Sequence, residues 1–193
     1  IRKSFLVDIL SKYMLSREIT IADFVEKYYK DKVSEDEIIL MRDYFIKMKE
    51  GKIECSHDFY LKLFHILMHH KIIKTPEYDI LMMDESGDIT GVSLEIFKLI
   101  RANKKVMVGD SQQNIYSFNQ TINGFEALSD EGEQLTLSQS FRVSTSLAPY
   151  VKEFCNTYLD PHMDFEGFPY KAMPEPKDIT MFYIARTNSG IIS

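Results

Sequence analysis

The sequence has few cysteines and no long apolar run. Of its 193 residues only Cys55 and Cys155 are cysteines, and they form neither a CxxC pair nor a Cys/His zinc pattern. We therefore expect two reduced thiols, as is usual in an intracellular protein. No apolar segment approaches the length of a membrane span, and residues 1–4 lack the features of a secretory signal peptide.

An excess of positive charge is also absent. The chain has 23 Lys and Arg residues against 29 Asp and Glu residues, a net charge of −6. This argues against a uniformly basic nucleic-acid-binding surface, but a local basic groove stays open, because partners respond to patches of charge. The 45% hydrophobic and 27% charged content is that of an ordinary globular protein. Because the chain begins without Met and ends in an apolar segment, we expect a fragment of a longer protein.

The first 70 residues have helical periodicity. Apolar residues recur every three or four positions between residues 4 and 70, which predicts several amphipathic helices. Ser34 and Glu37 form the capping-box pattern that opens a helix. The Met and aromatic stripes of this region are best explained as core-facing side chains.

A further helix is expected after Ser56 or Asp58, either of which suits a helix cap. His57 then lies just ahead of this helix, where a surface position is the simpler interpretation and contact with nucleic acid is the functional one. His65 and His69 are four residues apart, as in a metal-binding helix face, but no nearby Cys or carboxylate completes such a site.

A short apolar run ends in two adjacent carboxylates. Residues 80–83 are apolar and lead directly into Asp84 and Glu85. The run predicts a strand buried on both faces of a parallel sheet, and ligands of such sheets bind beyond the carboxyl ends of the strands. One acid can hold a divalent cation while its neighbour takes a proton from an attacking water. An acidic pair after a strand is also common as a helix cap or solvated turn.

Strand and helix patterns then alternate, which predicts a parallel α/β sheet with right-handed crossovers. Residues 160–177 are rich in proline and predict a linker. The expected elements are a helix at 92–100, a buried strand at 105–108, a helical turn at 113–118, a strand at 135–137, a helix from Thr145 and a strand at 179–185.

Polar groups follow three of the predicted strands: the Asp84–Glu85 pair, then Gln113, then Arg142. The spacings of 28 and 29 positions from Glu85 to Gln113 and on to Arg142 each fit one βαβ unit. In a parallel sheet such strand ends converge on one edge. An acid pair, a glutamine and an arginine are the groups needed to hydrolyse a nucleoside triphosphate.

Four segments resemble motifs of UvrD/Rep-type superfamily 1A helicases. Residues 84–88 (DESGD) resemble the D-E-A-Q-D Walker B box, and residues 109–118 (GDSQQNIYSF) resemble the G-D-x-x-Q-S-I-Y-x-[FW] motif III. Residues 137–144 (LSQSFRVS) are similar to L-x-x-N-[YF]-R-S, which closes the first RecA-like domain. Residues 182–188 (FYIARTN) resemble the start of the second. Together with residues 56–62, these motifs lean toward the F-box DNA helicase branch and its phage relatives.

The resemblance implies a catalytic role for each matching polar residue. Asp84 would hold Mg²⁺, and Glu85 would be the general base of ATP hydrolysis. Gln113 would contact the γ-phosphate of ATP. Arg142 would be the arginine finger, with a surface salt bridge as its alternative.

The resemblance also implies contacts with DNA. Tyr116 and Phe118 would stack on bases of single-stranded DNA, with packing in the core as the alternative. His57 is a third candidate DNA-binding residue.

The sequence departs from the family pattern at several places. Gly87 replaces the glutamine of D-E-A-Q-D, and residues 119–121 (NQT) stand where the family usually has R-G-A. No G-x-x-x-x-G-K-[ST] phosphate loop is present; Gly51-Lys52 lacks the partner glycine and the hydroxyl. We therefore expect these 193 residues alone to be inactive as an ATPase.

We predict an internal fragment of an ATP-dependent DNA helicase. Its fold would be a partial RecA-like parallel α/β sheet of the P-loop NTPase type with an N-terminal all-helical insertion. The expected parts are a helical region at 1–72, the α/β core at 73–160, a linker at 161–178 and the start of a second RecA-like domain at 179–193.

The full motor would include the N- and C-terminal parts missing here. It would use ATP and Mg²⁺ to move along single-stranded DNA and unwind duplex or forked DNA, in repair, recombination or replication. One alternative is a degenerate helicase-like module that binds DNA or protein without catalysis. Another is an NTPase with no nucleic-acid role.

Overall fold

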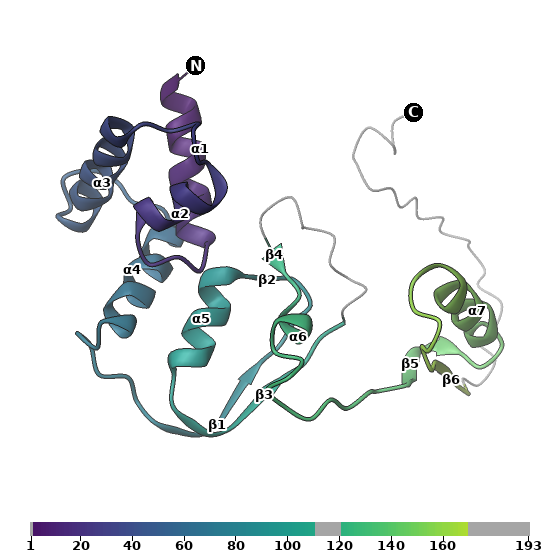
Figure 1. The fold of residues 1–193 in the computed structure, drawn as a ribbon. Coiled ribbons are helices and arrows are strands. Elements are labelled where there is room, and N and C mark those ends of the chain that lie inside the picture. The colour runs from purple at the N-terminus through teal and green to yellow at the C-terminus, as the bar shows by residue number, and fades with distance from the viewer. Residues whose placement is uncertain (1, 111–120, 170–193) are drawn as a thin grey trace, which may run out of the picture. The chain divides into compact units, whose positions relative to one another are not determined.

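The computed structural model describes residues 2–110 and 121–169 (Figure 1). The chain divides into two compact units, Ile1–Gln134 and Leu135–Ser193. The first unit holds a group of four helices followed by strands and two further helices. The second holds two strands and one helix.

The predicted helical region is confirmed as four helices. Ser34 caps the third helix, and both hydrogen bonds of the predicted capping box with Glu37 are present. Ser56 caps the fourth by accepting a hydrogen bond from the Phe59 N–H, so His57 is the first helical residue rather than the one ahead of the helix. The helices are α1 (Arg2–Leu15), α2 (Ile21–Tyr28), α3 (Glu35–Lys49) and α4 (His57–His69).

Side chains from all four helices form the core of the helical region. Tyr13 and Phe24 meet edge to face with ring centroids 5.9 Å apart, and Phe45 and Phe59 lie 4.9 Å apart. Burial of these apolar surfaces is the main source of helix stability in such a short bundle. The fully enclosed apolar residues include Ile9, Leu10, Tyr13, Phe24, Val25, Met41 and Phe59.

Strands begin at residue 78 and confirm in part the predicted parallel α/β arrangement. β1 pairs in parallel with β3, in the register Ile80↔Lys104 and Met83↔Met107. A second, two-residue pairing is antiparallel and joins β2 to β4. The elements are β1 (Tyr78–Met83), β2 (Ile89–Thr90), α5 (Gly91–Leu99), β3 (Ala102–Met107), β4 (Thr121–Ile122) and α6 (Gly124–Ala127).

The prediction that β1 and β3 are buried on both faces is wrong for the structure described here. Ile80 is 57% exposed and Met82 is 67% exposed. Lys105 of β3 donates hydrogen bonds to the carbonyl oxygens of Phe97 and Lys98 at the end of α5. Among the described residues, this sheet has two strands, and no helix covers the face that presents Ile80 and Met82.

The helical region is joined to α5 through the loop between α1 and α2. Gly91, the first residue of α5, lies so close to this loop that a Cβ there would come within 3.0 Å of the Arg17 backbone nitrogen. Lys62 of α4 is fully buried and donates hydrogen bonds to the carbonyl oxygens of Ser16 and Glu18 in the same loop. The loop therefore fixes α4 and α5 together.

The second unit consists of β5 (Gln139–Ser144), α7 (Ala148–Tyr158) and β6 (Glu166–Phe168). The predicted strand at 135–137 is wrong: Leu135 and Leu137 are exposed coil, and the strand starts at Gln139. Its hydrogen-bond partner explains the shift, because β6 pairs with residues 139–144.

Two other expectations concern this part of the chain. The helix expected from Thr145 begins at Ala148, and β6 lies within the range predicted as a linker. The predicted strand at 179–185 lies outside the described residues. Within the described ranges, no helix combines the length and apolar character that crossing a membrane requires.

Candidate functional site

The acidic pair lies in a tight turn directly after β1. The Asp84 Oδ1 atom accepts a hydrogen bond from the Glu85 N–H at 2.9 Å, and both side chains are exposed. Glu85 has a φ of 54°, in the left-handed region that non-glycine residues rarely adopt. The other described non-glycine residues with positive φ, Asp31 and Lys71, follow the ends of helices, where this conformation is common. At a strand end, such local strain is typical of a functional site.

Ser86 anchors this turn to two later segments of the chain. Its N–H donates to the Val108 carbonyl oxygen at 2.9 Å, just beyond β3. Its carbonyl oxygen accepts a hydrogen bond from the Gly124 N–H at 2.9 Å, at the start of α6. The acidic turn, the end of β3 and the start of α6 are therefore in direct contact. The prediction that the ends of β1 and β3 lie at one edge agrees with this arrangement.

Asp88 is a residue of this turn to which sequence reasoning assigned no role. Its backbone N–H donates to the Glu85 carbonyl oxygen at 3.3 Å. Its Oδ1 atom is buried and has no hydrogen-bond partner among the described residues. Burial of an unpartnered carboxylate oxygen is costly, so a hydrogen-bond donor or a cation beside the Asp88 Oδ1 atom would be stabilising. The signal in the sequence was the third acid of the DESGD segment.

The other predicted residues are not all placed by the structure. Gln113, Tyr116 and Phe118 lie outside the described residues. Arg142 belongs to the second unit, where it is an exposed residue inside β5 rather than one that follows a strand. Its backbone N–H donates to the Ser140 Oγ atom at 3.2 Å.

His57 is exposed at the start of α4, in the helical region. One turn further along the same helix, Tyr60 is also exposed. A hydrogen bond with the side chain of Cys55 raises the pKa of Tyr60. This corner of α4 thus presents an imidazole and a phenol to solvent.

His65 of α4 is a core residue, whereas His57 and His69 of the same helix are exposed. His65 is 1% exposed, and its Nδ1 atom has no hydrogen-bond partner among the described residues. Burial, with the nearby charge of Lys62, lowers the pKa of His65 to about 4. Across the described ranges, no three His, Cys, Asp or Glu side chains converge as a metal site would require.

A bound Mg²⁺ nevertheless fits the acidic turn. Mg²⁺ usually keeps several waters and is held by one or two carboxylates together with the phosphates of the substrate. The exposed Asp84 carboxylate, fixed at its Oδ1 by the Glu85 N–H, matches this requirement. Asp84 is therefore the residue that would hold the ion.

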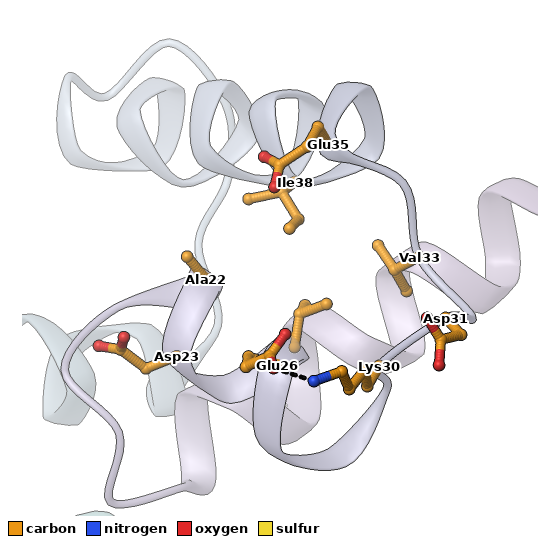
Figure 2. A pocket seen from close by; sticks show the side chains of 9 residues that line it. Ala22, Asp23, Glu26, Lys30, Asp31, Val33, Glu35 and Ile38 are labelled. Atoms are coloured by element: carbon orange, nitrogen blue, oxygen red, sulfur yellow. Dashed lines mark hydrogen bonds and ion pairs between the residues drawn. The ribbon is translucent and has the colours of Figure 1, made fainter.

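A hollow of about 410 Å³ lies elsewhere, between α2 and α3 (Figure 2). Its rim has several carboxylates, and Lys30 forms an ion pair with Glu26 at 2.6 Å. Ala22, Val25, Val33 and Ile38 supply its apolar lining. None of the predicted site residues lines it, and we place the candidate site at the acidic turn.

Comparison with known proteins identifies the family of the chain. The family model of the UvrD/REP helicase N-terminal domain matches residues 6–131, which include most of α1, the whole of α2, α3 and α4, and the acidic turn. The chain belongs to the UvrD/REP helicase family. This confirms the family that the sequence motifs indicated. The UvrD/REP match ends before Arg142, so it gives no support to the role predicted for that residue.

One relative of this UvrD/REP-family chain is F-box DNA helicase protein 1 of Schizosaccharomyces pombe. The two are 33% identical over 95 residues, which cover 48% of this chain and 11% of the relative. The chain thus spans a small part of that helicase. No solved structure gives a significant match.

Proposed function

We propose that this chain is part of an ATP-dependent DNA helicase and that the Asp84–Glu85 turn is its hydrolytic acid pair. The observation that carries the proposal is the left-handed Glu85 at the carboxyl end of a parallel strand, next to an exposed Asp84. Membership of the UvrD/REP family and a relative named as a DNA helicase support the same function. We further propose that the strands of the first unit belong to a RecA-like sheet.

The two acids would divide the chemistry. Mg²⁺ held by Asp84 would shield the charge of the ATP phosphates. Glu85 would accept a proton from the attacking water, since its carboxylate is exposed and one residue away. Because adjacent side chains leave the backbone in different directions, the two groups can reach the metal and the water at once.

The remaining roles rest on the motif resemblance. Gln113 would contact the γ-phosphate, and Arg142 would neutralise charge in the transition state. Tyr116, Phe118 and His57 would contact single-stranded DNA during translocation and unwinding. The phosphate loop, which the 193 residues lack, would come from another part of the longer protein.

The Glu85→Gln variant of the full-length protein tests this function. The amide keeps the size of the side chain but cannot accept the proton, so turnover should fall by about 10²- to 10⁴-fold while ATP affinity changes little. Steady-state ATPase rates and equilibrium nucleotide binding measure the two effects. A collapse of affinity with near-normal turnover would show that Glu85 is not the base.

The same assay addresses the second candidate function. Gly87 in place of the family glutamine and the missing phosphate loop favour a module that binds DNA or protein without catalysis. In that case the wild-type full-length protein would bind DNA but show no Mg²⁺-dependent ATPase activity.

A further inference from the structure

Ser86 is the most enclosed residue of the acidic turn. Its side chain is completely buried, and its Oγ donates to the Met83 carbonyl oxygen at 3.0 Å. With the N–H bond to Val108 and the carbonyl bond from Gly124, every polar group of Ser86 is engaged. Ser86 therefore fixes the peptide that immediately follows Glu85.

Two glycines pack against the backbone of Ser86. A Cβ on Gly109 would lie 2.7 Å from the Ser86 nitrogen, and Gly109 has a φ of +157°. A Cβ on Gly124 would lie 2.8 Å from the Ser86 carbonyl oxygen. Real Cβ atoms do not approach backbone atoms so closely, so a larger residue at either position must change the packing around Ser86.

These contacts restrain Glu85 from its C-terminal side. No described residue donates a hydrogen bond to the Glu85 carboxylate, so among these residues its direction depends on its own backbone. On the N-terminal side, the Asp84 Oδ1 holds the Glu85 N–H. On the other side, Ser86 is tied to β1, to the end of β3 and to α6. The left-handed φ of Glu85 is thus enforced by its neighbours.

We propose that Ser86, clamped by Gly109 and Gly124, is the positioning residue that aims Glu85 at the attacking water. This inference rests on the proposed function of Glu85 as general base. Ser86 acts through Glu85 and needs no contact with substrate. The geometry matters because a general base works only within hydrogen-bond reach of its proton, and displacement by about 1 Å can cost about 10²-fold in rate.

The contacts of Gly109 and Gly124 with Ser86, called the clamp below, also bring separate parts of the chain together at Ser86. Gly109 and Gly124 stand on either side of residues 110–123 in the sequence, and both reach Ser86. Movement of β3 or α6 relative to β1 would therefore alter the peptide beside Glu85. Asp88, whose N–H bonds the Glu85 carbonyl oxygen, would move with it.

The test uses the full-length protein with Gly124→Ala and Gly109→Ala. Gly132→Ala is the matched control, because a Cβ on Gly132 would have no atom within 4 Å. Each clamp variant should lower kcat for ATP by about 10-fold or more, with KM changed by no more than about 3-fold, because positioning affects the transition state and not ground-state binding. Gly132→Ala should match the wild type.

A second pair of variants covers the case in which the glycine variants do not fold. Ser86→Ala removes the hydroxyl but leaves the Met83 carbonyl oxygen paired with the Val108 N–H at 2.8 Å. Its control is Ser16→Ala, which removes another buried hydroxyl bonded to a carbonyl oxygen, that of Tyr13 at 2.8 Å. We expect Ser86→Ala to lower kcat by about 3- to 10-fold at unchanged KM and Ser16→Ala to leave kcat unchanged.

Each clamp substitution is then combined with Glu85→Gln to decide whether the clamp acts through the general base. Residues that act as a unit lose activity non-additively, so the clamp changes should cause little further loss once the base is removed. A full additional loss in the Glu85→Gln background, or a kcat no lower than in the controls, would overturn the clamp. Near-normal turnover of Glu85→Gln alone would instead refute the proposed function.

Discussion

The Nζ atom of Lys62 on α4 lies 3.0 Å from the carbonyl oxygen of Ser16 in the loop between α1 and α2. The same ammonium group lies over the ring of Tyr13, 4.4 Å from its centroid. It is an ammonium group enclosed by protein, held by carbonyl oxygens and an aromatic face rather than by a carboxylate contact. Burial lowers the pKa of Lys62 to about 7, against the opposing effect of Glu18 and Glu95. Lys62 therefore links α4 to the loop between α1 and α2.

Replacement of Lys62 by Met should destabilise the first unit. The variant keeps the aliphatic stem but leaves the Ser16 and Glu18 carbonyl oxygens without their donor, each at a cost of about 1–3 kcal/mol, partly offset because no charge is buried. We expect a net loss of about 1–3 kcal/mol in the free energy of unfolding. Urea denaturation measures it, with the exposed Lys49→Met as control. An unchanged urea midpoint would mean that the hydrogen bonds of Lys62 contribute nothing to the free energy of unfolding.

The buried His65 predicts a pH dependence of stability. Its pKa is about 4 in the folded chain and 6.5 when unperturbed, so between these values the unfolded chain binds more protons. Stability should therefore rise with pH across this window, by at most about 1.4 kcal/mol per pH unit from this group. Lys62 acts with the same sign between about 7 and 10.5.

His65→Gln isolates that contribution. The variant cannot titrate at this position, so the difference in unfolding free energy from the wild type should change between about pH 4 and 6.5 and level off above about pH 7.5. His70→Gln, at an exposed position after α4, is the control. A difference that is flat over the whole range would place the His65 pKa near its ordinary value.

The helices were predictable because their signals are local. Ser34 and Glu37 lie three residues apart, and the cap they form depends on nothing distant. Burial of β1 was not predictable in the same way, because an apolar run fixes a strand but not what covers it; Ile80 and Met82 are exposed. The position of β5 depends on β6, whose proline-rich surroundings predicted no strand.

The candidate site was predictable to a similar extent. The position of Asp84 and Glu85 beyond a parallel strand follows from the chain order. The left-handed backbone of Glu85 and the enclosure of Ser86 do not, since Ser86 is packed against Gly109 and Gly124, more than 20 residues away in the sequence. A serine after two acids gives no sign of burial, and only the packed turn shows it.

The 193 residues alone should not hydrolyse ATP. Without a phosphate loop, no ring of backbone N–H groups is available to cradle the β- and γ-phosphates. Release of labelled phosphate from ATP and Mg²⁺ should stay at the level of a Glu85→Gln sample of the same chain. Strong Mg²⁺-dependent turnover that depends on Glu85 would show that these residues hold a complete site.

Substitution of Tyr116 and Phe118 distinguishes a DNA-dependent helicase from an NTPase with no nucleic-acid role. If these side chains stack on bases, each contact contributes about 1–3 kcal/mol, and their loss should weaken the response to single-stranded DNA. In the full-length protein, Tyr116→Ala combined with Phe118→Ala should leave basal ATPase activity intact, because neither residue is assigned to the phosphates. DNA-stimulated turnover and duplex unwinding should fall together, because both require single-stranded DNA to be held by these side chains. The exposed aromatic Tyr44→Ala on α3 is the control. Stimulation that persists undiminished in the double variant would assign both aromatics to the core.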